Sequence, residues 1–118
     1  MYDSYSLLID IFNTAKKDIV IIDNYIDKGL LDVLRDIDKD ILTITNKFNN
    51  NDYNKYHLQY NNIKLKINNN IHDRFIIIDK KELYHCGASF KDLGKKCFGI
   101  NKIESKDWLN KVLKLTIK

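Results

Sequence analysis

Proline is absent from this chain of 118 residues, and glycine occurs only four times. Arginine is almost as rare, since Arg35 and Arg74 stand against eighteen lysines. No apolar run approaches the roughly 18 residues that a transmembrane helix needs, and no secretory signal pattern follows Met1. We therefore expect a protein that is neither secreted nor membrane-spanning, and a cytoplasmic location.

Cysteine is also scarce. Cys86 and Cys97 show neither a CxxC spacing nor a His/Cys pattern typical of a metal site. We expect both to be reduced thiols within strands, and we expect no metal and no cofactor. A two-carboxylate metal site from Asp23 and Asp27 is a weak alternative, because a turn or cap role suits these acids better.

The length predicts one domain, residues 1–118, with a single core. A formal net charge of +4 at pH 7 and a pI near 9.0 favour a polyanionic partner. The same surplus follows from the lysine-rich composition of an AT-rich genome, so charge alone does not establish contact with nucleic acid.

The hydrophobic pattern predicts a mixed sheet with helices on both faces, which is an α/β fold. Strands alternate with helices early in the chain, and a hairpin follows late. A loop is expected over 47–54, where asparagine is abundant. Expected strands are 18–26, 40–46, 63–67, both arms of a hairpin turning at 79–82, and 97–103; expected helices are 3–16, 30–37 and one opening at Ser105 with Trp108, Leu109, Val112 and Leu113 inward.

The hairpin holds the most informative residues. Side chains alternate along a strand, so His72 and Arg74 should point to the same face. A short turn gives residue numbers that sum to about 161 across the ladder, which places Ser89 opposite His72 and Gly87 opposite Arg74. Because the turn lacks glycine, a register shifted by one or two residues stays open. One face would then offer an imidazole, a guanidinium fork and a hydroxyl to one phosphate.

The spacing His72-x-Arg74-x4-Asp79, followed by Gly87-x-Ser89, resembles the HKD motif of the phospholipase D superfamily, with Arg74 where lysine is usual. Residues 18–27 and 84–96 resemble the matching segments of a bacterial and phage branch, so the likeness covers nearly the whole chain. It implies a phospholipase D-like half-domain. The chain departs from the motif because seven residues precede Gly87 where six are usual, and no asparagine follows Ser89 at the customary place.

The resemblance implies metal-independent phosphodiester hydrolysis. His72 would attack phosphorus, and because the chain has one motif, a second His72 would come from a homodimer partner. Arg74 would neutralise phosphate charge, with Asp79 as an orienting or structural acid more than a chemical one. Ser89 and Lys91 would be phosphate ligands, and Glu104 an acid that buttresses the histidine. Lys64 and Lys66 share one face of the expected strand 63–67 and could add to a basic groove that binds phosphate, although a solvated face suits them better.

Other interpretations stay open. His85 is a rival histidine on the same expected face, opposite Ile76, whereas His57 suits the surface. Arg74 could instead pair with Asp79; alternation points Asp73 away from it. At the level of function, the chain is expected to be a phosphodiesterase or nuclease acting on nucleic acid or a nucleotide-like phosphodiester. The alternatives are a catalytically weak binding module that keeps the phosphate pocket, with a role in phage–host regulation or defence, and a structural dimerisation module.

Overall fold

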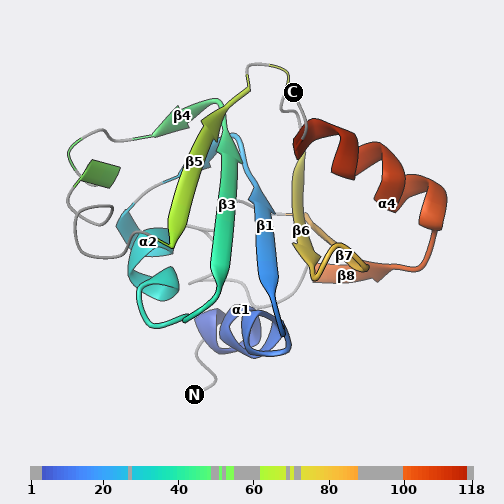
Figure 1. Ribbon diagram of the computed structural model, residues 1–118, viewed down its shortest axis with the longest axis horizontal. Helices are drawn as coiled ribbons and strands as arrows, with labels where there is room; N and C mark the ends of the chain where they lie inside the picture. The colour runs from blue at the N-terminus through green and yellow to red at the C-terminus, as the bar shows by residue number, and fades with distance from the viewer. Residues whose placement is uncertain are drawn as a thin grey trace.

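The computed structural model describes residues 4–26, 28–48, 51, 53–54, 62–68, 70, 73–87 and 100–116. Their main feature is a six-stranded sheet with the order β5-β3-β1-β6-β7-β8 (Figure 1). The strands are β1 Asp18–Ile22, β3 Asp40–Thr45, β5 Ile63–Ile67, β6 Arg74–Ile78, β7 Glu82–Cys86 and β8 Ile100–Ile103. A separate parallel pair joins β2 Tyr25–Ile26 to β4 Lys47–Phe48. No helix of the described ranges is long and apolar enough to cross a membrane.

The sheet is mixed, as the sequence predicts. Strands β1, β3 and β5 are parallel, whereas β6, β7 and β8 join them as antiparallel neighbours. The seam between the two halves is the antiparallel pairing of β1 with β6. The carboxyl ends of the three parallel strands therefore lie at the same end of the sheet as the first residue of β6.

Helices cover both faces of the sheet (Figure 1). On one face, α1 and α2 pack against Ile19, Ile21, Ile76 and Ile78. On the other, α4 packs against Val20, Ile22, Phe75 and Ile77. The helices are α1 Ser4–Asn13, α2 Lys28–Leu34 and α4 Lys106–Leu113, and α4 continues into the 3-10 turn Lys114–Thr116. β1 and β6 are thus buried on both sides, which explains why they read as continuous apolar runs.

The closing helix begins where the sequence predicts. Ser105 is its N-cap, and its hydroxyl accepts the Trp108 N–H at 3.2 Å. Val112 is buried against the sheet. The prediction that Trp108 points inward is wrong, because its side chain is 52% exposed. The Lys111 ammonium instead lies 5.3 Å from the centre of the indole ring.

The hairpin register is shifted by one residue from the expectation that paired residue numbers sum to about 161. Arg74 pairs with Cys86 and Phe75 with His85, so paired residue numbers sum to 160. Asp79 and Lys80 have φ values of 54° and 59°, which form the left-handed turn that suits a twisted hairpin even without glycine. The Lys81 N–H closes this turn on the Ile78 carbonyl at 3.0 Å.

The one-residue shift moves every side chain of β7 to the other face. His85 lies opposite Phe75 rather than Ile76, so the expectation that it shares a face with Arg74 is wrong. The pairings predicted for Ser89 and His72 fall on residues outside the described part of the chain, as does the loop that bears Lys91.

Candidate functional site

Arg74 and a buried carboxylate meet at the carboxyl end of β1. Ile22 and Phe75 are the last paired residues of the β1–β6 ladder, and Asp23 and Arg74 stand one position beyond them. Both project on the face that α1 and α2 cover. Arg74 Nε lies 3.5 Å from Asp23 Oδ1, with the Asp23 side chain 0% exposed and that of Arg74 26% exposed. The ends of strands in open sheets are common ligand positions.

The burial of this pair constrains the arginine. A carboxylate removed from water needs a cation or hydrogen bonds nearby, so Asp23 holds the guanidinium at this place. Arg74 Nε is itself buried and makes no hydrogen bond within the described residues. The exposed quarter of the side chain therefore lies away from Nε. A guanidinium has five N–H donors, and the remaining donors suit the two oxygens of one phosphate.

The Cys86 thiol next to this pair is not in its reactive thiolate form. Cys86 is paired with Arg74 across the β6–β7 ladder and is fully buried. Burial first, and then the charge of Asp23, raise the pKa of Cys86 to about 12, although Arg74 acts in the opposite direction. Because the thiolate is the reactive form, Cys86 is a packing residue here, as expected for a buried reduced cysteine.

A second pair of polar side chains lies on the opposite face at the same end of β6. His85 Nε2 is 2.7 Å from Asp73 Oδ1, and the same oxygen accepts the Arg74 backbone N–H at 2.9 Å. The His85 ring also packs against Phe75, with centroids 5.4 Å apart. The expectation that Asp73 points away from the Arg74 side chain is confirmed. His85 is held by Asp73 on the far face from the guanidinium.

Asp79 has a structural position. Its carboxylate accepts three backbone N–H groups, from Lys16 at 2.9 Å, Lys17 at 2.8 Å and Asp18 at 3.2 Å. These hydrogen bonds lower the pKa of Asp79. Arg74 begins β6 and Asp79 follows its end, so the two lie at opposite ends of the strand. The expectation of Asp79 as a site acid, and as a partner for Arg74, is therefore corrected.

Glu104 also lies away from Arg74. Ile103 pairs with Leu83, near the turn of the hairpin, and Glu104 comes one position later. Its side chain is 84% exposed, and its neighbour is the Lys102 ammonium at 4.0 Å. The strand register thus carries Glu104 to the Asp79 end of the sheet, away from Arg74; its expected partner, His72, lies outside the described residues.

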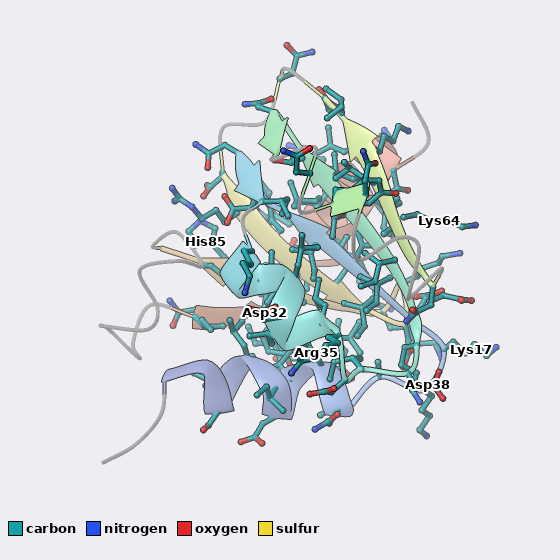
Figure 2. All side chains as sticks on the ribbon, turned by 90° about the vertical axis from the view of Figure 1, so that its left-hand side faces the viewer. Lys17, Asp32, Arg35, Asp38, Lys64 and His85 are labelled. Atoms are coloured by element: carbon teal, nitrogen blue, oxygen red, sulfur yellow. The ribbon has the colours of Figure 1, made fainter. Side chains whose placement is uncertain are left out.

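Lys64 and Lys66 do share one face of β5, as predicted, but it is the face opposite Arg74. They pair with Leu42 and Ile44, of which Ile44 belongs to the core under α4. The Lys66 ammonium donates to the Thr116 carbonyl at 3.1 Å, and Lys64 borders a cavity of about 360 Å³ near α4. Figure 2 shows Lys64 of β5 and His85 of β7 well apart, at the two sides of the view, although both belong to the face opposite Arg74. A basic groove that joins these lysines to Arg74 is not formed by the described residues.

The remaining candidates, His72, Ser89 and Lys91, lie outside the described residues, as does Asp27. Within the ranges that are described, no three His, Cys, Asp or Glu side chains gather as a metal site. Sequence reasoning considered Asp23 as a turn or cap residue and as a weak metal ligand, and it missed the contact of Asp23 with Arg74. The available signal was an acid directly after the apolar run of β1, in a chain with only two arginines.

Comparisons with known proteins find likeness in structure alone. No protein-family model matches the chain, and no curated protein matches its sequence. Among solved structures, NucT from Helicobacter pylori superposes with a TM-score of 0.67 at 15% identity, over 96% of this chain and 84% of that one. TrmBL2, an archaeal chromatin protein whose structure shows a mode of DNA binding, gives a TM-score of 0.55 at 11% identity, over 95% of this chain and 46% of that one. The chain therefore shares the α/β fold of NucT, with a six-stranded mixed sheet and helices on both faces.

Proposed function

We propose that the chain is a phosphodiesterase that acts on nucleic acid or on nucleotide-like phosphodiesters. The observation that carries this proposal is the position of Arg74. The chain has only two arginines, and this one is anchored by a buried acid at the carboxyl ends of the parallel strands, with a quarter of its side chain exposed. The motif that contains Arg74 also contains His72, two positions earlier in the sequence. The shared fold with NucT supports the same proposal.

The proposed reaction has two steps. The His72 imidazole attacks phosphorus, the bond from phosphorus to the leaving oxygen breaks, and the second imidazole gives that oxygen a proton. Water then attacks phosphorus and gives a proton to the second imidazole, the bond from phosphorus to the His72 nitrogen breaks, and the phosphomonoester is released with both histidines restored. Because the chain has one such motif, the second imidazole is His72 of another copy in a homodimer. Arg74 stabilises the charge on phosphorus in both steps, and Ser89 and Lys91 remain proposed phosphate ligands.

The test is turnover by the purified protein. Single-stranded DNA, double-stranded DNA, RNA and an aryl phosphodiester are incubated with the parent, His72→Ala and His57→Ala, each with and without a chelator. The parent and His57→Ala should turn over at the same rate, and a chelator should leave that rate unchanged. His72→Ala should lose several orders of magnitude in rate with little change in binding, because the nucleophile acts mainly on the transition state. Activity that is abolished by the chelator and indifferent to His72→Ala would overturn the proposal.

A binding module is the second candidate, and the contact between Arg74 and Asp23 favours it. A guanidinium whose charge is largely balanced by a buried acid is suited to hold a phosphate loosely, without strong activation of phosphorus. TrmBL2, which is similar in fold, is described as a DNA-binding chromatin protein. Oligonucleotide binding that weakens steeply with salt, together with no turnover of any phosphodiester, would establish this candidate in place of the enzyme.

A further inference from the structure

Asp23 stands directly behind the proposed phosphate-binding arginine. Its carboxylate is fully buried and lies 3.5 Å from Arg74 Nε. Its backbone N–H is bound to the Ile44 carbonyl at 3.0 Å, which fixes the residue at the end of β1. A ligand that reaches the exposed part of the guanidinium therefore meets a cation with a negative charge behind it.

We propose that Asp23 sets the charge selectivity of this site, so that it accepts phosphodiester monoanions without the preference for dianionic terminal phosphates that an isolated arginine would have. The proposal rests on the function proposed above and narrows its substrate class. Attraction to Arg74 and repulsion from Asp23 both scale with the charge of the ligand. An isolated arginine would therefore prefer the dianion, whereas the balanced pair removes most of that preference. A phosphodiesterase gains from this balance because its monoester products draw no binding advantage over the substrate from their extra charge.

Burial singles out Asp23 among the acids at this end of the sheet. Asp73 is adjacent to Arg74 in the sequence, but its side chain is 51% exposed and faces His85. Water and salt screen an exposed charge strongly and a buried charge much less. Asp73 is therefore the matched control: an acid at the same edge, near the same arginine, without the burial.

The experiment compares two small probes that differ in charge. Dimethyl phosphate is a monoanion, and methyl phosphate is mostly a dianion at pH 7.5, because the second pKa of a phosphate monoester is about 6. Each is titrated into the parent, Asp23→Asn and Asp73→Asn while the Nε–H signals of the arginines are followed by NMR. Only two such signals exist in the chain, and that of Arg35 serves as the internal reference.

The expected result is that Asp23→Asn binds both probes more tightly, and that the gain in affinity is larger for the more highly charged probe. Loss of the repulsion should raise the affinity for dimethyl phosphate roughly tenfold and that for methyl phosphate roughly a hundredfold. The change in binding free energy doubles because the dianion carries twice the charge. Any loosening of the arginine acts in the opposite direction, because it weakens the attraction to Arg74 and does so more for the dianion. Asp73→Asn should change either affinity by no more than about twofold.

Other outcomes decide the matter without ambiguity. Equal gains for both probes would overturn the selectivity of Asp23 and leave the phosphate site intact. Failure of the Arg74 signal to respond to either probe, in any variant, would overturn the phosphate site itself. If Asp23→Asn does not fold, the parent gives the answer: it should bind the two probes with similar affinity, and a tenfold preference for methyl phosphate would refute the proposal.

Discussion

Replacing Arg74 with alanine should destabilise the fold, apart from any effect on a ligand. The substitution leaves the Asp23 carboxylate buried without the arginine that lies 3.5 Å from it. Two unit charges at that distance attract each other by about 5 kcal/mol at an effective dielectric constant of about 20. Removal of one partner from a buried pair is typically worth about 3 to 5 kcal/mol. Because Arg74 is a quarter exposed, we expect the lower end, about 3 kcal/mol.

The chain supplies a close control for this prediction. Arg35 Nε lies 3.5 Å from Asp36 Oδ1, the same distance between the same atom types, but these side chains are 46% and 79% exposed. Arg35→Ala should therefore change the free energy of unfolding by less than about 1 kcal/mol. The two pairs differ mainly in burial, so the difference between the two changes in the free energy of unfolding measures what burial adds to the cost of losing the arginine.

Urea unfolding of the parent and both single variants is the assay, with Asp23→Asn/Arg74→Ala as a third variant. A loss of about 3 kcal/mol in Arg74→Ala corresponds to a fall in Tm of roughly 10 °C. The double variant should recover part of this loss, because its buried group no longer carries a charge. Equal effects of Arg74→Ala and Arg35→Ala, with no recovery in the double variant, would refute the reasoning.

Three further predictions concern pH, salt and assembly. Hydrogen bonds from the Lys16 and Lys17 backbone lower the pKa of Asp79 from 3.8. The Asp79 carboxylate therefore stabilises the fold above the unfolded pKa, and this stabilisation is lost as pH falls through the lower folded pKa. Asp79→Asn should reduce Tm at pH 7 and flatten the acid limb of a Tm–pH curve, and an unaltered limb would contradict this. Oligonucleotide affinity of the parent should fall steeply between low and physiological salt, measured by fluorescence anisotropy, and a flat response would count against phosphate contacts. Light scattering should give about twice the chain mass of 14.0 kDa, whereas a monomer at every concentration would remove the source of the second His72.

Much of the fold could be predicted because it depends on local pattern. Residues 63–67 alternate apolar and lysine side chains and form β5 over that range. Ser105 caps α4 as predicted, because capping depends on residues three positions apart. The register of the hairpin was less accessible, because it depends on whether Asp79 and Lys80 adopt positive φ, which residues other than glycine do rarely.

The candidate site was predicted less well than the fold. The contact between Asp23 and Arg74 joins residues far apart in the sequence, and it depends on how β1 aligns with β6. The motif likewise placed Asp79 among the site residues, as an orienting or structural acid, but most of the five-residue strand β6 separates it from Arg74. Sequence spacing gives the face of a side chain along one strand. It does not give the strand that lies beside it.

The position of Asp79 has a consequence for the whole sheet. Its carboxylate holds the backbone of residues 16–18, and its own N–H bonds the Asp18 carbonyl at 3.0 Å. These hydrogen bonds fix the alignment of β1 with β6 at one end of the two strands, and the Asp23–Arg74 contact lies at the other end. Slippage of the seam by one residue would bring Phe75 opposite Asp23 and turn the guanidinium toward the α4 face. The Asp79 turn therefore fixes the register that places Arg74 beside Asp23 at the other end of the strand.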